Sequence, residues 1–383
     1  MKVLYVDQTG ALGGGELAIL PWICHARAGA SVVLFEDGPF RGQLEQCGVP
    51  VEILELDDLK GVRREADLGA IFRIVPAFLR LRRRLAAKAV SFDVIYANSQ
   101  KAFLVAALSR HKRQLLVWHL RDILTGEHFS PVLRWIAVAF GNRFATVVIT
   151  NSQATADAFM AAGGNSGKVR MVYDGVSHQP FDRVKPEEVQ ALRRELGGES
   201  VTLIGHFGRI SHWKGQHVLL EAIRGLPGVH VVLVGDALFG EEDYGERIRA
   251  LAMTPELEGR VRFLGFRRDI PALMKSMDFI AHTSTAPEPF GLVIVEGMLA
   301  GRPVIATAAG GALEILRCSS TGNVGLLTAP GSVCELRDAI RWLLDHPKEG
   351  EQLAALAQKR ALESFSLQRL FDALAAVLER VGR

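Results

Sequence analysis

The chain has 383 residues, of which 49% are hydrophobic and 23% are charged, and its formal net charge is +3. This length and apolar content predict two globular domains with buried cores and exclude disordered and fibrous classes. The sequence has no run of 18 apolar residues and no basic-then-apolar leader, which predicts a protein that neither spans a membrane nor carries a secretory signal peptide.

Short β-rich runs alternate with helical patterns through the first half of the chain. Such alternation predicts a parallel sheet covered by helices. The predicted strands are Lys2–Asp7, Ser31–Glu36, Val51–Leu56, Asp93–Ala97, Leu115–Leu120, Thr146–Thr150 and Val169–Tyr173.

A glycine loop, Gly13–Gly15, follows the first predicted strand and precedes a helix that we expect to open with Glu16. Without side chains, Gly14 and Gly15 would let backbone N–H groups approach a phosphate or a sugar. A structural turn explains three glycines equally well, because the full dinucleotide-binding spacing is absent.

A basic segment, residues 72–88, follows the third predicted strand. Its apolar stripe consists of Ile71, Ile74, Val75, Phe78, Leu81 and Leu85, and Arg73, Arg80 and Arg84 lie opposite. The pattern fits an outer helix of the domain with a solvated basic face, and it equally fits a helix that contacts anionic lipid. The sequence leaves both interpretations open.

His119 lies at the end of an apolar predicted strand, where residues that face a ligand emerge in parallel α/β sheets. A lone histidine at such a place is more often a structural group, because nothing in the sequence identifies its partner.

The alternating pattern restarts after a segment, residues 175–200, that carries two prolines and a Gly-Gly pair and is typical of a linker. The second set of predicted strands is Val201–Phe207, Val231–Val234, Val261–Leu264, Phe279–His282, Pro303–Thr307 and Val324–Leu327. The fold class is therefore α/β, with two doubly wound Rossmann-like domains. Ligands of such sheets bind beyond the carboxyl ends of the strands, so we expect the active site in a cleft where the two domains face each other.

Two cations, Arg209 and Lys214, lie in a glycine-bounded turn after the first strand of the second set. Arginine offers a flat fork of donors and lysine a point charge, and both fit phosphate oxygens. This pair predicts a clamp for a diphosphate, although surface exposure is the default for such residues.

Two carboxylates, Glu288 and Glu296, stand eight residues apart around a predicted helix start near Phe290. The backbone N–H groups of Phe290, Gly291 and Leu292 would point at an anion before the helix. Carboxylates beside that anion suit sugar and ribose hydroxyls, which donate hydrogen bonds.

With these motifs the chain resembles the retaining glycosyltransferases of family 4, whose two Rossmann-like domains form the GT-B fold. The signature is Glu288 to Glu296, followed by Gly301 to Val304. The resemblance implies an acceptor-binding domain over residues 1–180, completed by the helix 367–383, and a nucleotide-sugar-binding domain over residues 181–366. It also implies that His119 contacts the donor sugar near its reacting carbon, that Glu288 positions this sugar and that Glu296 holds the ribose.

The predicted function is transfer of a sugar from a nucleotide diphosphate to a hydroxyl acceptor, with a lipid-linked glycan of cell-envelope or exopolysaccharide synthesis as the candidate acceptor. Retention of configuration is implied by the resemblance alone. A sugar-phosphate synthase or phosphorylase remains an alternative, and it would use further cations such as Arg121 and Lys101. A non-catalytic partner subunit that binds the nucleotide sugar is another, whereas nucleic-acid binding is not expected.

No metal or other cofactor is predicted, because the sequence lacks His-Glu-x-x-His, paired cysteine ligands and Asp-x-Asp. The cationic clamp would replace a metal ion at the diphosphate. The four cysteines show no Cys-x-x-Cys spacing and are expected to be reduced thiols, which predicts a cytoplasmic protein, with the inner face of the membrane as a candidate location.

Overall fold

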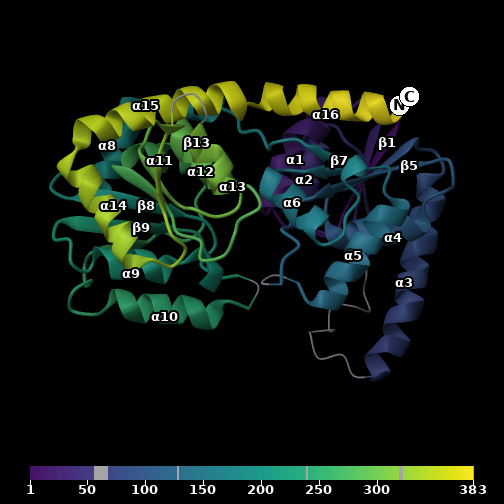
Figure 1. The fold of residues 1–383 in the computed structure, drawn as a ribbon, viewed down its shortest axis with the longest axis horizontal. Helices are drawn as coiled ribbons and strands as arrows, with labels where there is room; N and C mark the ends of the chain where they lie inside the picture. The colour runs from purple at the N-terminus through teal and green to yellow at the C-terminus, as the bar shows by residue number, and fades with distance from the viewer. Residues whose placement is uncertain (56–67, 127–128, 239, 319–321, 383) are drawn as a thin grey trace. The chain divides into compact units, whose positions relative to one another are not determined.

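The computed structural model describes residues 1–55, 68–126, 129–238, 240–318 and 322–382, with the side chains of residues 68–75 left out. The chain divides into two compact units. Unit 1 comprises residues 1–175 and 367–383, and unit 2 comprises residues 176–366. In each unit a parallel sheet carries helices on both faces (Figure 1), so the predicted fold class of two Rossmann-like α/β domains is confirmed.

Unit 1 is built on a seven-stranded sheet of order β3-β2-β1-β4-β5-β6-β7, in which every neighbouring pair is parallel. Each strand begins within one residue of its predicted start, and β2, β3 and β7 end earlier than predicted. The strands are β1 (Val3–Asp7), β2 (Ala30–Leu34), β3 (Val51–Ile53), β4 (Val94–Ala97), β5 (Leu115–Leu120), β6 (Val147–Thr150) and β7 (Val169–Met171).

Helices cover this sheet because their apolar stripes pack into one hydrophobic core on each face. The helices of unit 1 are α1 (Gly14–His25), α2 (Pro39–Gln46), α3 (Leu68–Ala89), α4 (Gln100–Ser109), α5 (Pro131–Phe144), α6 (Gln153–Ala161), the short η2 (Ser166–Lys168) and α16 (Leu367–Gly382). Helix α1 begins at Gly14 and not at Glu16, because the Glu16 carboxylate accepts from the N–H of Gly13 at 3.0 Å and so caps the turn from its third position.

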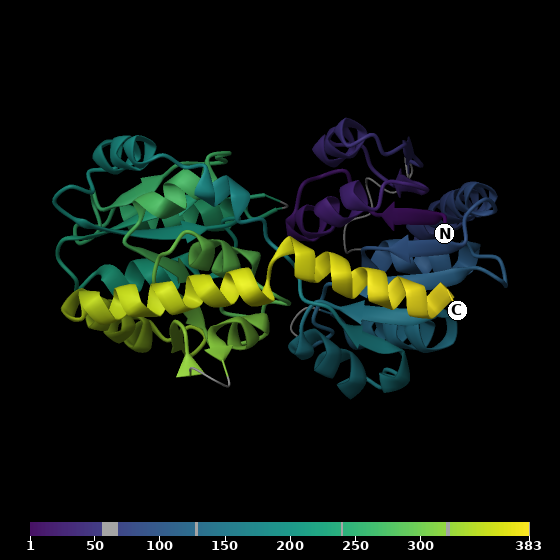
Figure 2. The ribbon, with the colours of Figure 1, turned by 90° about the horizontal axis from the view of Figure 1, so that it is seen from above.

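Helix α16 supplies core to unit 1 although it is the last element of the chain. Its buried side chains Leu370, Leu374, Val377 and Leu378 join the cluster that contains residues of β1, β2 and α1. Figure 2 shows α16 lying along unit 1, with the N and C ends of the chain at the same edge of this unit.

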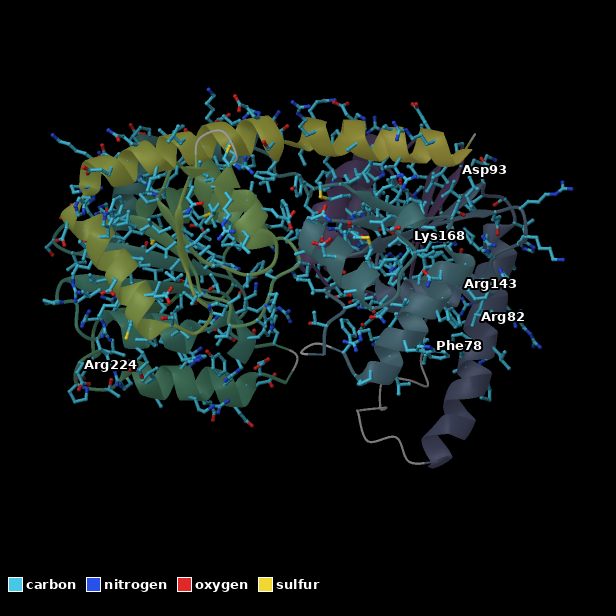
Figure 3. All side chains as sticks on the ribbon, in the orientation of Figure 1. Phe78, Arg82, Asp93, Arg143, Lys168 and Arg224 are labelled. Carbon is cyan, nitrogen blue, oxygen red and sulfur yellow. A yellow bond between two sulfur atoms is a disulfide. The ribbon has the colours of Figure 1, made fainter. Side chains whose placement is uncertain are left out.

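The described part of α3 packs on its own unit. Leu81 and Leu85 are buried in the core, whereas Arg80 and Arg84 are exposed. Arg82, labelled on this helix in Figure 3, donates from Nε to the Leu108 carbonyl at 2.7 Å. The described apolar residues of the stripe therefore face protein. The remaining residues of the predicted stripe and of its basic face lie outside the described side chains; they are Ile71, Arg73, Ile74 and Val75.

Unit 2 has a six-stranded parallel sheet of order β10-β9-β8-β11-β12-β15 and a small antiparallel pair, β13-β14. Its strands are β8 (Thr202–Phe207), β9 (Val229–Val234), β10 (Val261–Phe263), β11 (Phe279–His282), β12 (Val304–Thr307), β13 (Arg317–Cys318), β14 (Gly322–Asn323) and β15 (Leu326–Thr328). Its helices are α7 (Gln179–Asp182), α8 (Pro186–Glu195), the short η3 (His212–Lys214), α9 (Gln216–Ile223), α10 (Glu242–Ala252), α11 (Ile270–Ser276), α12 (Leu292–Leu299), α13 (Gly311–Leu316), α14 (Val333–Asp345) and α15 (Pro347–Ser364).

The prediction of four reduced cysteines is wrong for one pair. Cys24 and Cys47 form a disulfide with their Cα atoms 5.4 Å apart, while the exposed Cys334 is a free thiol. The pair forms because α1 and α2 pack together and bring their C-terminal ends side by side, which the spacing of 23 residues does not reveal. No helix in the described ranges has the length and apolar character needed to cross a membrane.

Candidate functional site

The turn after β8 carries Lys214 at the carboxyl edge of the unit 2 sheet. Gly215 ends η3 with φ of 70°, and a Cβ there would stand 2.0 Å from the Thr283 carbonyl oxygen. Only glycine fits this position. The Thr283 hydroxyl donates to the carbonyls of Lys214 and Gly215, at 3.0 Å each, so the loop after β11 holds the turn in place.

Glu288 lies at the centre of a polar cluster in this unit. Its Oε1 is 2.7 Å from Lys214 Nζ, and its Oε2 accepts from His282 Nε2 and, at 3.2 Å, from the Ser284 hydroxyl. The side chains of Lys214 and Glu288 are 11% and 16% exposed, so a ligand can still reach the pair. We call Lys214, His282, Ser284 and Glu288 the Glu288 cluster.

Two glycines that follow β12, Gly310 and Gly311, fix the backbone of Glu288. Its carbonyl accepts from the N–H of Gly311 at 2.8 Å, and a Cβ at Gly310 would lie 2.2 Å from the same oxygen. Glu288 and Gly310 therefore pair as a short parallel bridge, which sets the direction of the carboxylate.

The charges around Glu288 determine whether its carboxylate is protonated. Burial by itself raises the pKa of Glu288, but Lys214 and His282 outweigh burial and hold this pKa far below its usual range. Burial and the neighbouring His282 lower the pKa of His206 to about 4, so His206 is neutral near pH 7. Glu288 is thus an ionised carboxylate, which suits accepting hydrogen bonds and does not suit donating a proton.

The predicted helix start near Phe290 is wrong by two residues. Helix α12 begins at Leu292 with Gly291 as its N-cap, at φ of 111°. The Phe290 ring is 2% exposed and packs edge-on against Phe365, at 5.7 Å between centroids. Phe290 is thus a core side chain ahead of the helix, and the first helical N–H is that of Leu292.

Glu296 lies in the second turn of α12. Burial raises its pKa to about 7, so its charge is held at a cost in free energy. Arg209 is exposed in the turn after β8, and its carbonyl accepts from Gln216 Nε2 at 2.8 Å. Of the site residues predicted in unit 2, Lys214 and Glu288 are brought together as an ion pair.

A second polar cluster lies at the carboxyl edge of the unit 1 sheet. The Arg121 guanidinium donates to Asp174 Oδ1 at 2.6 Å and to Asn98 Oδ1 at 2.8 Å. Asn98 in turn donates to Asp7 Oδ2 at 2.7 Å, and Asn151 donates to Asp174 Oδ2 at 3.1 Å. We call these five residues the Arg121 cluster. Its central ion pair is 8% and 3% exposed.

The predicted residues of unit 1 adjoin this cluster. His119 is fully buried, and its Nδ1 lies 2.7 Å from the Tyr96 hydroxyl and 3.3 Å from Arg121 Nη2. A Cβ at Gly15 would lie 3.3 Å from Arg121 Cδ, whereas Gly14 is exposed with open space beside it. Gly15 thus lets α1 approach Arg121, and Gly14 is the one that faces solvent.

Sequence reasoning missed the partners in both clusters. His282 and Ser284 could have been found, because His282 ends β11 and Ser284 follows it, six and four residues before Glu288. The pair Gly310 and Gly311 after β12 was a further signal. The contact between Tyr96 and His119 depends on the pairing of β4 with β5, which no motif in the sequence indicates.

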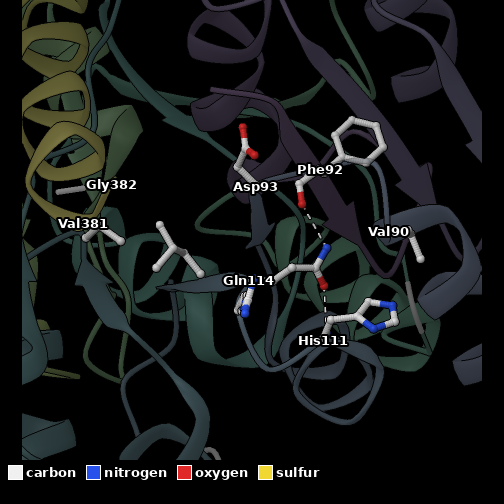
Figure 4. Close-up of a pocket in the computed structure, with 9 residues that line it drawn as sticks. Val90, Phe92, Asp93, His111, Gln114, Val381 and Gly382 are labelled. Carbon is white, nitrogen blue, oxygen red and sulfur yellow. Dashed lines mark hydrogen bonds between the residues drawn. The ribbon is translucent and has the colours of Figure 1, made fainter.

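Two pockets in the described residues lie away from both clusters. One of about 580 Å³ is lined by residues at the amino edge of the unit 1 sheet, including Phe92, Asp93 and Gln114 (Figure 4). Gln114 Nε2 there donates to the Phe92 carbonyl at 2.9 Å, so this polar lining is already paired. Within the described parts of the chain, no group of three or more His, Cys, Asp or Glu side chains is placed to hold a metal ion.

Comparison with known proteins agrees with this architecture. Residues 190–360 match the family described as Glycosyl transferases group 1, and residues 20–175 match the Glycosyl transferase 4-like domain. The crystal structure of Anabaena HepE in complex with UDP and glucose is 41% identical in sequence, has a TM-score of 0.88 and covers 99% of each chain. The same protein in complex with UDP-glucose is 40% identical, with a TM-score of 0.89, over 99% of this chain and 100% of that one.

Curated relatives are more distant. The D-inositol 3-phosphate glycosyltransferase of Corynebacterium urealyticum is 26% identical over 367 residues, which cover 88% of this chain and 83% of that protein. Spore coat protein SA of Bacillus subtilis is 27% identical over 224 residues, or 56% of this chain, and the match spans 59% of the relative's length. Two family matches and a full-length neighbour at 41% identity show that this chain belongs to the family 4-like glycosyltransferases of the GT-B fold.

Proposed function

We propose that the protein is a retaining, metal-independent glycosyltransferase that uses UDP-glucose as donor and a hydroxyl group as acceptor. The UDP and UDP-glucose bound to Anabaena HepE, at 40–41% identity, support this choice of donor. We assign donor binding to unit 2 and acceptor binding to unit 1. The observation that carries the proposal is the ion pair between Lys214 and Glu288, which sets a cation and an ionised carboxylate side by side at the carboxyl edge of a parallel sheet.

The chemistry asked of these residues is stabilisation of charge. As the glycosidic bond lengthens, negative charge builds on the leaving diphosphate, and Lys214, Arg209 and the N–H groups at the start of α12 would stabilise it. In the Glu288 cluster the lysine would bridge the diphosphate and Glu288. This cation takes the place of a metal ion in our proposal.

Glu288 would orient the donor sugar by accepting from its hydroxyls. Its pKa lies far below the usual range, so it has no proton to give and is a weak base. We therefore propose that a departing phosphate oxygen takes the proton of the acceptor hydroxyl on the face of the sugar that the leaving group vacates. The new bond then forms on that face, which retains the anomeric configuration. Glu296 would accept from the ribose hydroxyls.

The donor is tested by thermal unfolding with UDP, GDP, ADP and their glucose derivatives. A ligand at 100 times its dissociation constant adds about 2.7 kcal/mol to the native state. We expect a selective rise with UDP and UDP-glucose that is lost in Lys214→Ala. A protein that binds UDP-glucose and never releases UDP in the presence of acceptors would instead be a non-catalytic partner subunit.

Metal independence and retention need separate measurements. Turnover should be unchanged after chelation with EDTA, and the product formed from UDP-α-glucose should carry an α-linkage by NMR. A β-linked product would overturn retention. Turnover that depends on phosphate as acceptor would point to the phosphorylase alternative, which Arg121 supports poorly because its charge is already paired with Asp174.

A lipid-linked glycan remains our proposed acceptor, with contact between the exposed arginines of α3 and anionic lipid as a further proposal. Arg80 and Arg84 of this helix are exposed. Vesicles with anionic lipid should pellet the protein at low salt and release it at high salt. Binding to neutral vesicles alone would overturn the role of the arginines.

We also propose the cytoplasm as the location of the protein, although disulfides such as Cys24–Cys47 are rare there.

A further inference from the structure

His119 has one satisfied nitrogen and one unsatisfied nitrogen, both buried. Nδ1 lies 2.7 Å from the Tyr96 hydroxyl and 3.3 Å from Arg121 Nη2. In the described part of the protein, Nε2 is buried and has no hydrogen-bond partner. A buried polar atom left in this way costs free energy, so it marks a place where a partner is expected.

The neighbours of Nδ1 decide where the imidazole hydrogen lies. A guanidinium only donates, so the nitrogen that faces Arg121 must present its lone pair. The Tyr96 hydroxyl then donates to the same lone pair. In a neutral ring the hydrogen therefore lies on Nε2.

The ring is also held neutral. Burial, and then the positive charge of Arg121, lower the pKa of His119 well below its ordinary value. A second proton on Nδ1 would in addition point at the guanidinium.

Arg121 is itself fixed in place. Its Nη1 donates to Asp174 and its Nε to Asn98, so the guanidinium has no freedom to turn away from His119. Gly15 packs against its stem, where a Cβ would come to 3.3 Å. The charge of Arg121 is balanced by Asp174 within hydrogen-bonding distance, so this corner offers no net positive charge to a phosphate.

We propose that Tyr96 and Arg121 are positioning residues that hold His119 as the tautomer with hydrogen on Nε2, which makes the ring an uncharged hydrogen-bond donor within unit 1. This tautomer does not depend on the proposed function. An uncharged donor in a charge-balanced setting suits a hydroxyl better than a phosphate oxygen.

The tautomer is tested in the full-length protein without ligand. Nitrogen-15 labelling of the 11 histidines and two-bond proton–nitrogen NMR spectra distinguish the two tautomers and the imidazolium. The His119 signals are those that disappear in His119→Gln. We expect an unprotonated Nδ1, a protonated Nε2 and no titration of this ring near the ordinary histidine pKa. The opposite tautomer, or a titrating ring, would overturn the proposal.

Variants separate positioning from a general effect on folding. Tyr96→Phe and Arg121→Lys should give mixed tautomers at His119, or the onset of titration. Tyr244→Phe is the matched control, because its hydroxyl contacts His217 Nδ1 at 2.8 Å in unit 2, and it should leave the His119 signals unchanged. Unchanged His119 signals in both unit 1 variants would refute the role of Tyr96 and Arg121.

Discussion

The polar clusters of the two units balance charge in opposite ways. In the Glu288 cluster, Lys214 and His282 outweigh burial and keep one carboxylate ionised. In the Arg121 cluster, burial instead raises the pKa of Asp7, and Arg121 is committed to Asp174. Similar sheet edges therefore have different roles, since unit 2 keeps a partly exposed ion pair and unit 1 uses its buried ion pair to fix neighbouring side chains.

The largest effect is expected from removing the carboxylate of Asp174, which pairs with Arg121 in the Arg121 cluster. Asp174→Ala leaves the guanidinium of Arg121 buried without its counter-charge, and breaking a buried pair in this way costs about 3–5 kcal/mol. We expect a large loss of stability in urea unfolding. Asp174→Asn keeps the shape and a hydrogen-bond acceptor, so it should cost clearly less. Equal effects would show that packing and not charge is responsible.

Lys214→Ala tests the Glu288 cluster. Loss of one charge-stabilising donor lowers turnover about 10²–10³-fold, and we expect such a loss with UDP-glucose as donor. The control is Arg341→Ala, which removes an exposed cation paired with the exposed Asp338 at 3.3 Å. Turnover of this control should equal that of the wild type. If Lys214→Ala also keeps its turnover, the proposed clamp is wrong.

Reduction of the disulfide should affect unit 1 alone. Cys24 and Cys47 close a loop of 23 residues, and opening a loop of this size costs about 3 kcal/mol on the chain-entropy account. Scanning calorimetry with and without a reductant should shift the transition of unit 1 to lower temperature and leave that of unit 2 in place. Cys24→Ser should reproduce the shift without a reductant. Four free thiols in the untreated, denatured protein would show that the bond does not form.

The smallest expected effect concerns Glu296. Burial raises its folded pKa from 4.5 to about 7, so ionisation of Glu296 costs the folded state free energy. Stability therefore falls as pH rises from about 4.5 towards 7, and this part of the fall should vanish in Glu296→Gln. The raised pKa corresponds to at most about 3 kcal/mol, because Glu296 is partly exposed, and we expect the variant to gain up to this amount at pH 8 relative to pH 4, measured by urea unfolding. Parallel stability curves for the two proteins would contradict the shifted pKa.

The fold was predictable to a greater extent than the site. Alternating strand and helix patterns give two parallel sheets because buried parallel strands are short, apolar and β-branched. The start of α12 was misplaced, since Phe290 is apolar enough to begin a helix but is instead buried against Phe365. The bond between Cys24 and Cys47 and the contact of Tyr96 with His119 depend on packing between elements distant in the chain, which periodicity does not encode.

The placement of α16 has a consequence for how the chain acquires its structure during synthesis. Unit 2 is one continuous stretch, residues 176–366, and all of its core is available once that stretch has left the ribosome. Unit 1 begins first but lacks four core side chains, the last of them Leu378, until α16 has been made. The domain that is translated first is therefore completed last. Its apolar surface near β1 and α1 stays exposed to solvent while unit 2 is synthesised.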